Sequence, residues 1–205
     1  MKTLLIILSL LIGYLLGSIN PAIIYSRLKG RDIRTLGSKN AGATNTLRNF
    51  GKGAALIVTL SDILKCVAAI LAASLLARLF AEDELVSKIF AATGCILGHN
   101  FPVYFGFRGG KGVLVSVTAL FMIDWRIGAA ALGIFIVVFM IWRYVSLGSI
   151  TGAIAAMAAS LITKDVYVTA FTAFAALLTI MRHRSNILRL IEGTESKTTF
   201  HSHKE

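Results

Sequence analysis

The residues best suited to chemistry lie in a glycine-rich stretch around a single lysine. Residues 105–113 read FGFRGGKGV and separate two apolar runs of the chain. Glycine lacks a Cβ, so the chain can bend until successive N–H groups point inward at one anion. A lysine beside such a bend favours phosphate as that anion. The structural alternative is a flexible turn whose lysine reaches the membrane surface.

A second polar cluster lies earlier in the chain, in residues 37–45, which read GSKNAGATN and are followed by Arg48. This segment can form a tight loop, because asparagine and glycine tolerate left-handed backbone. The guanidinium of Arg48 can hold a phosphate through two hydrogen bonds. The segment therefore predicts a second anion site, and the alternative is a basic loop that contacts lipid headgroups.

A third cluster begins at His183, three residues before Asn186, so both side chains share one face of a helix. Each can form a hydrogen bond with a phosphate or a carbonyl oxygen. A single histidine near a membrane boundary is more often structural than catalytic, but His183 lies among other polar residues. Ser146 and Ser149 could add donors, although a polar helix start is the favoured interpretation of these two serines.

Other chemistries are excluded by the residues that the sequence lacks. Neither Gly112 nor Val113 is a serine or threonine, so Lys111 does not fit a nucleotide-binding P-loop. No group of carboxylates is placed to hold Mg²⁺, and no GxSxG motif supplies a serine nucleophile. Cys66 and Cys95 lie inside apolar runs without zinc-ligand spacing, so we expect buried thiols and neither a metal nor a cofactor.

The composition indicates an integral membrane protein. Apolar residues make up 56% of the 205 residues and charged residues 15%, whereas a soluble domain carries about 25% charged residues. The apolar runs predict an all-α fold of seven transmembrane helices in one domain, residues 1–205. The third and fourth runs are shorter than the roughly 20 residues of a full span. The runs are 3–25, 53–79, 86–97, 113–123, 127–142, 147–162 and 166–181.

The basic residues predict the orientation of these helices. Of the 21 lysines and arginines, 15 lie in residues 27–52, 98–112, 143–146 and the tail from residue 182. Short loops rich in lysine and arginine stay in the cytoplasm. We therefore expect the N-terminus outside, the C-terminus inside and every polar cluster facing the cytoplasm. This distribution accounts for the net charge of +11 without a nucleic-acid partner, and it leaves His201 and His203 in a solvated tail.

Asp62 and Lys65 interrupt the second apolar run with two charges. They are three residues apart and therefore share one face of the helix. A charge inside a membrane is a candidate functional residue by default. An ion pair that fixes helix packing is an equal alternative, and the sequence leaves both open.

Together the three clusters resemble the bacterial acyl-phosphate:glycerol-3-phosphate acyltransferases of the PlsY type. The resemblance rests on residues 32–34 with 37–45, on 98–102 with 109–113, and on 183–190 with 193–195. It spans nearly the whole chain, and three spaced motifs are far more specific than any one of them. Two departures occur: Lys39 stands where the family pattern has glycine, and Leu114-Val115 replaces a small residue and a hydroxyl residue.

The resemblance implies an enzyme of the bacterial inner membrane that carries out the first step of phospholipid synthesis. Such an enzyme would transfer a fatty acyl group from acyl phosphate to the 1-hydroxyl of glycerol 3-phosphate, and the products would be lysophosphatidic acid and phosphate. Its partners would be these two substrates and the surrounding membrane lipids. We expect it to need no cofactor and to be a monomer.

The resemblance assigns the residues of these clusters to the two substrates. The residues expected to bind acyl phosphate are Gly109, Gly110, Lys111, Gly112, Ser146, His183 and Asn186, and those expected to bind glycerol 3-phosphate are Ser38, Asn40, Asn45, Arg48 and Lys111. Lys111, His183 and Asn186 are the expected catalytic residues. An acyl phosphate already has a good leaving group, so the enzyme mainly positions two anions. We expect the substrate's own phosphate, and not His183, to accept the proton, because no carboxylate is placed to orient this histidine.

A membrane transporter or regulator for organic phosphates is the alternative function. Transporters often contain inverted repeats with broken helices in matching positions, and the sequence shows no matching pair. All the polar clusters are also expected on one side of the membrane, which suits an enzyme better than a transporter.

Overall fold

A computed structural model describes residues 1–198, and within this part of the chain the secondary structure is helical, without β-strands. The chain divides into two compact units, residues 1–123 and the part that begins at Asp124. Each unit is described by itself, so the expectation of a single domain stays a prediction. The tail histidines His201 and His203 lie outside the described residues.

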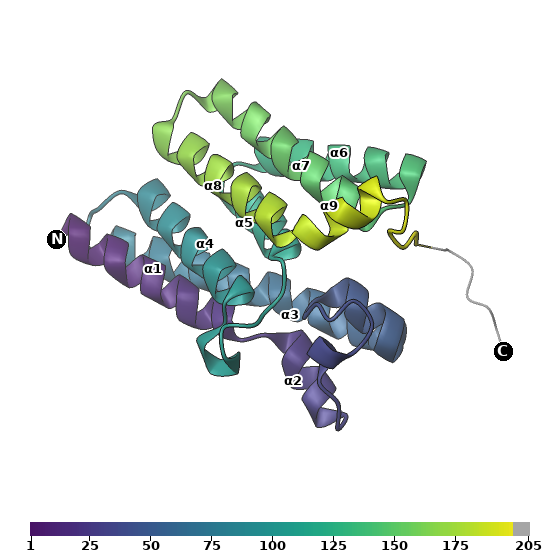
Figure 1. Cartoon of the computed structure of the whole chain (residues 1–205). Helices are drawn as coiled ribbons and strands as arrows, with labels where there is room; N and C mark the ends of the chain where they lie inside the picture. Colours follow the sequence, from purple (N-terminus) through teal and green to yellow (C-terminus); the bar gives the residue numbers. More distant parts are fainter. Residues whose placement is uncertain (199–205) are drawn as a thin grey trace. The chain divides into compact units, whose positions relative to one another are not determined.

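The first unit is built on three long helices, because α1 lies along α4 and α3 packs against both (Figure 1). The apolar faces of these helices cover one another, which is how their hydrophobic side chains are removed from solvent. Its elements are α1 Lys2–Ser18, α2 Pro21–Leu28, η1 Ile33–Thr35, α3 Ala43–Leu79, α4 Glu84–Asn100, η2 Val103–Phe105 and α5 Val113–Ile123.

Two breaks shape the polar end of this unit. The first predicted run, 3–25, is interrupted after α1, and α2 restarts at Pro21, where a proline is tolerated because the first helical N–H needs no partner. The side chain of Asn20 caps α2 by accepting a hydrogen bond from the N–H of Ile23, at 3.1 Å. The second break is Gly51, whose φ of +84° separates a short helix over 43–50 from the long part of α3.

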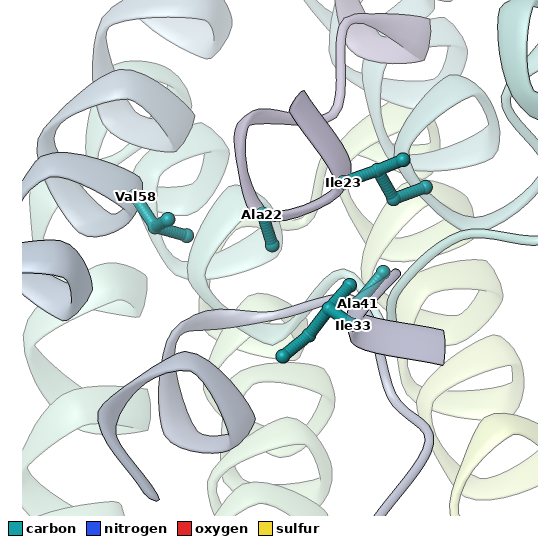
Figure 2. Close-up of a cluster of buried hydrophobic side chains, with 5 residues drawn as sticks. All are labelled: Ala22, Ile23, Ile33, Ala41 and Val58. Atoms are coloured by element: carbon teal, nitrogen blue, oxygen red, sulfur yellow. The ribbon is translucent and has the colours of Figure 1, made fainter. Parts of the chain in front are cut away.

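A small hydrophobic core holds the first polar loop against the helices. Figure 2 shows its five side chains, which come from α2, the 33–41 region and α3, and all five are buried. Phe50 and Phe105 are partly buried and pack against this core. The loop that carries the second polar cluster is therefore folded onto the helices by apolar contacts, although most of its residues are polar. The five core residues are Ala22, Ile23, Ile33, Ala41 and Val58.

The second unit is a helical layer in which α7 packs against both α6 and α8. The side chains of Asp124 and Asp165 cap the N-termini of α6 and α8 by accepting backbone N–H bonds. The α8 helix ends at Arg182, and α9 leaves it at an angle of 60°. The elements of this unit are α6 Trp125–Trp142, α7 Val145–Ser160, η3 Leu161–Thr163, α8 Val166–Arg182 and α9 Arg184–Ile191.

The predicted all-α class is confirmed, and the predicted apolar runs lie in helix, apart from the break at residues 19–20 in the first run. By length and composition, four helical stretches can cross a membrane, at Lys2–Leu28, Ala43–Leu79, Trp125–Trp142 and Val145–Thr163. A fifth is possible if α8 and α9 form one bent span, and α5 is a shorter apolar helix. Cys66 and Cys95 are buried free thiols, as expected. The number of seven spans and their orientation stay predictions.

Candidate active site

Asn45 organises the loop of the second polar cluster. Its side chain is buried, and its amide nitrogen donates to the carbonyls of Ile33, Leu36 and Asn40 at 3.2, 2.9 and 3.1 Å. Its amide oxygen accepts the backbone N–H of Ser38 at 3.1 Å. Because both ends of the amide serve the loop itself, the structure gives Asn45 a shaping role, which the sequence did not predict. Its contact with glycerol 3-phosphate stays a prediction.

The other candidate ligands of glycerol 3-phosphate lie around this loop. Ser38 and Arg48 are exposed to solvent, and Asn40 is half-buried. Ser38 belongs to the loop, whereas Arg48 lies on the short helix 43–50 that follows it. Exposed hydroxyl and guanidinium groups can reach an anion without breaking contacts inside the protein, and this property fits the expected binding role of both residues.

Lys39, the departure from the family pattern, has a φ of +58°. This left-handed backbone explains why glycine suits the position, since a Cβ makes such a conformation less favourable. We expect Lys39→Gly to raise the free energy of unfolding by about 1 kcal/mol with little change in activity. The matched control is Lys29→Gly, because Lys29 has a φ of −92° and glycine there should destabilise the protein. Thermal unfolding in detergent checks both variants, and a lower melting temperature for Lys39→Gly would contradict the prediction.

The glycine-lysine stretch is tied back onto the end of α4. The N–H of Gly109 donates to the carbonyl of Asn100 at 3.2 Å, and the N–H of Gly110 donates to that of His99 at 3.0 Å. This differs from the expected nest, because both N–H groups point at α4 carbonyls. A Cβ on Gly110 would overlap Nε2 of His99 and come within 2.6 Å of the Ala41 carbonyl oxygen. Glycine here permits close packing, and a phosphate contact through Gly109 or Gly110 stays a prediction.

Gly112 and Lys111 complete the stretch. Gly112 has a φ of +75°, and its carbonyl accepts the N–H of Ser116 at 2.7 Å, so it turns the chain into α5. Lys111 is half-buried at this turn, between the loop and the helix start. A lysine at the N-terminus of a helix lies where the helix dipole already favours an anion. The phosphate contact of Lys111, like that of Gly109 and Gly110, stays a prediction.

Arg34 joins the two loops of the first unit. Its guanidinium donates to the carbonyls of Phe105 and Arg108 at 2.8 and 3.3 Å, and it forms an ion pair with Asp32 at 2.7 Å. Hydrogen bonding to Arg34 lowers the pKa of Asp32 to about 2. The stabilisation by this carboxylate is therefore present above its ordinary pKa of 3.8 and is lost as the pH falls toward 2. The family motif includes both residues, but the sequence did not reveal that they connect the loops.

A buried ionic cluster lies beneath the glycine stretch. Nζ of Lys65 lies 2.8 Å from Oδ1 of Asp62 and donates to the carbonyls of Gly17 and Ile19 at 3.0 and 2.7 Å. Nδ1 of His99 lies 3.2 Å from the same carboxylate oxygen and 3.1 Å from Nζ of Lys65. Asp62 and Lys65 therefore form an ion pair. This pair contacts His99, the residue against which Gly110 packs.

The second unit gathers its polar residues around Glu195. One carboxylate oxygen accepts hydrogen bonds from Oγ of Ser146 at 2.7 Å and from Nδ2 of Asn186 at 2.6 Å. The other oxygen accepts Nε of Arg189 at 2.7 Å. Burial alone would raise the pKa of Glu195, but the hydrogen bonds from Ser146, Asn186 and Arg189 more than offset it, and the pKa lies below its ordinary value. Ser146 thus donates its hydroxyl hydrogen inside the protein, so its expected phosphate contact stays a prediction.

His183 occupies the bend between α8 and α9. Its Nδ1 lies 2.8 Å from the carbonyl oxygen of Thr179, and the side chain is buried. Because a carbonyl only accepts hydrogen bonds, this contact assigns the hydrogen to Nδ1, and the expected contact of His183 with acyl phosphate stays a prediction. The second unit therefore places three of the predicted residues on adjacent elements, with His183 at the bend, Asn186 on α9 and Ser146 at the start of α7.

These features define a class of protein: an all-helical chain with apolar helices of membrane-spanning length and with polar loops that carry lysine, arginine and histidine. The chain belongs to the glycerol-3-phosphate acyltransferase family, whose model matches residues 7–193. A glycerol-3-phosphate acyltransferase of Clostridioides difficile (strain 630) is 41% identical over 187 residues, which are 91% of this chain and 92% of that protein. One of Synechococcus sp. (strain CC9902) is 41% identical over 93% of this chain and 94% of its own.

Two crystal structures have the same fold. Both are of PlsY (YgiH), described as an integral membrane glycerol 3-phosphate acyltransferase, and both are 34% identical to this chain. The glycerol 3-phosphate form has a TM-score of 0.86 and covers 95% of this chain and 96% of its own. The lysophosphatidic acid form has a TM-score of 0.82 and covers 95% of each chain. The fold similarity extends over nearly the whole length of the chain.

Proposed function

We propose that this chain transfers a fatty acyl group from acyl phosphate to the 1-hydroxyl of glycerol 3-phosphate, with lysophosphatidic acid and phosphate as products. The observation that carries the proposal is the match over 95% of the chain to PlsY in a form with glycerol 3-phosphate and in a form with lysophosphatidic acid. These two molecules are the acceptor and the product of such a transfer. The motifs and the chemistry of the loops support acyl phosphate as the acyl donor.

The loops suit a reaction between two phosphorylated substrates. An acyl phosphate is a mixed anhydride, so phosphate leaves readily and no nucleophilic side chain is needed. The enzyme has to bring two anions together and offset their repulsion. In the first unit, we assign Ser38, Arg48 and Lys111 to glycerol 3-phosphate, with Asn45 shaping the loop that presents Ser38 and Asn40.

The second unit supplies the groups that we assign to acyl phosphate. His183 and Asn186 keep the roles predicted from their motif, and Ser146 acts with Glu195 to orient Asn186. Nδ1 of His183 lies 2.8 Å from the carbonyl oxygen of Thr179, whereas the group that orients a general-base histidine is a carboxylate. This contact supports proton transfer to a substrate phosphate.

The membrane placement is part of the same proposal. We propose one membrane domain with seven spans in the bacterial inner membrane, with the N-terminus outside and the active site facing the cytoplasm, acting as a monomer without metal or cofactor. The excess of lysine and arginine in the loops at 27–52 and 98–112 and in the tail supports this orientation. The short helix α5, at about 1.5 Å per residue, reaches only about half-way through a bilayer unless flanking residues extend it.

Phosphate release tests the proposed function directly. Purified protein in detergent is mixed with palmitoyl phosphate and glycerol 3-phosphate, and free phosphate and lysophosphatidic acid are measured together. We expect both products in equal amounts, and neither product when glycerol 3-phosphate is left out. No release, combined with uptake of labelled glycerol 3-phosphate into liposomes that contain the protein, would instead identify a transporter.

A further inference from the structure

The buried cluster of Asp62, Lys65 and His99 is larger than helix packing requires. Relative exposures of 2%, 8% and 4% place all three side chains in the interior. Removing two charges from water is costly, and an ion pair in a core is often no more stable than apolar residues of the same size. The cluster therefore adds little to stability as such, and its placement points to a further role.

The cluster joins the middle of α3 to the ends of α1 and α4. Lys65, in the middle of α3, donates to the carbonyls of Gly17 and Ile19, where α1 ends. Asp62, one turn earlier on α3, contacts Lys65 and His99, and His99 lies in the last turn of α4. Nζ of Lys65 thus contacts the carbonyls of Gly17 and Ile19, Oδ1 of Asp62 and, at 3.1 Å, Nδ1 of His99. Oδ1 of Asp62 also lies 3.2 Å from Nδ1 of His99, so this ring nitrogen faces both members of the ion pair.

This arrangement fixes the histidine ring beneath the glycine stretch. With Nδ1 placed against both Asp62 and Lys65, the opposite edge of the ring, at Nε2, lies where a Cβ of Gly110 would be. The carbonyl of His99 also accepts the N–H of Gly110 at 3.0 Å. The position of Gly110, immediately before Lys111, is therefore set twice by His99, once through its backbone and once through its ring.

The same contact reaches the loop assigned to glycerol 3-phosphate. The carbonyl oxygen of Ala41 would lie 2.6 Å from a Cβ of Gly110, and it accepts a hydrogen bond from Nδ2 of Asn20 at 3.4 Å. Ala41 follows Asn40 and lies within the segment 37–45. A shift of the His99 ring would consequently move Gly110 relative to Ala41, and with them Lys111 relative to the loop of Ser38.

We infer that Asp62, Lys65 and His99 form a positioning triad that sets the distance between the glycine-lysine stretch and the loop at 37–45 for the phosphate of glycerol 3-phosphate. The inference rests on the proposed function for the identity of the substrate. The three residues act through the backbone of Gly110 and Ala41 and are not themselves assigned a contact with substrate. A displacement of about 1 Å is sufficient for a large effect in such a site.

His99→Asn separates this role from a structural one. The amide of asparagine reaches the position of Nδ1 and can keep the contact with Asp62, but it lacks the ring edge under Gly110. We expect His99→Asn to leave the melting temperature nearly unchanged and to raise the Kd for glycerol 3-phosphate at least about tenfold, as measured by calorimetry in detergent. We expect the KM for acyl phosphate to change less than twofold. His99→Gln, whose longer side chain reaches the Nε2 position, is expected to bind more tightly than His99→Asn.

Glu84→Gln is the matched control. Glu84 is at the opposite end of α4, accepts a hydrogen bond from Ser74 at 2.7 Å and pairs with Arg78 and Lys88. We expect this variant to lower the melting temperature while the Kd for glycerol 3-phosphate stays the same. Asp62→Asn is the second test, since it keeps the shape of the side chain and should raise the same Kd.

The outcomes separate the inference from the proposed function. If His99→Asn and Asp62→Asn lower only the melting temperature or kcat, with the Kd for glycerol 3-phosphate equal to that of the unmodified protein, the triad is structural and the inference fails. If the unmodified protein binds glycerol 3-phosphate but releases no phosphate from acyl phosphate, the proposed function fails, and a weaker Kd in His99→Asn still supports the triad. If the unmodified protein does not bind glycerol 3-phosphate at all, both fail.

Discussion

Lys111→Ala is expected to lower kcat/KM by at least about 100-fold, the loss typical of removing one group that stabilises transition-state charge. In the proposed reaction two phosphates approach each other, and the ammonium of Lys111 is the cation that the sequence assigns to both. Its position at the start of α5 adds the favourable field of the helix terminus. The measurement is phosphate release at several concentrations of each substrate, which yields both KM values and kcat.

Arg108→Ala is the control for this variant. Arg108 carries the same charge three residues earlier and is exposed. Its backbone carbonyl accepts a hydrogen bond from Arg34 at 3.3 Å, and this contact survives the substitution. We expect a loss of about twofold at low salt, as for an exposed charge that is screened by solvent. Equal losses in both variants would mean that the stretch contributes only general positive charge.

Glu195→Gln is expected to lower kcat/KM about tenfold to 100-fold and to reduce the melting temperature as well. The carboxylate accepts hydrogen bonds from three side chains, Ser146, Asn186 and Arg189. A glutamine offers one accepting oxygen and turns an NH₂ group toward at least one of these donors, so a buried donor loses its partner, which costs about 1–3 kcal/mol. Asn186 would then lose the contact that holds its side chain in place.

The pH dependence distinguishes this charge effect from simple loss of shape. Because hydrogen bonds hold the pKa of Glu195 below its ordinary value of 4.5, the carboxylate stabilises the folded protein above pH 4.5, and this contribution disappears as the pH falls through the lowered pKa. The difference in melting temperature between the unmodified protein and Glu195→Gln should therefore shrink below about pH 4.5. A difference that stays constant down to pH 3 would contradict this account. Glu192→Gln, an exposed neighbour, is the matched control and should have little effect.

Much of the fold could be predicted because its signals are local. The apolar runs 53–79 and 166–181 are long enough that helix was the expected structure, and both are helical. The break near Pro21 falls where Ser18 and Asn20 stand beside this proline. Helix ends were less predictable: α4 continues to Asn100, because His99 and Asn100 are buried by neighbouring elements, which the local pattern does not reveal.

The sequence by itself determined the helices and the polar clusters between them. The spacing of its three motifs also indicated the family. Only the tertiary structure decided how the polar side chains are used. Asn45 is committed to its own loop, Ser146 to Glu195, which is 49 positions away, and His99 to Asp62 beneath the glycine stretch. The physical reason is that hydropathy and residue spacing act over a few turns of helix, whereas a hydrogen-bond partner is chosen by the packing of distant segments.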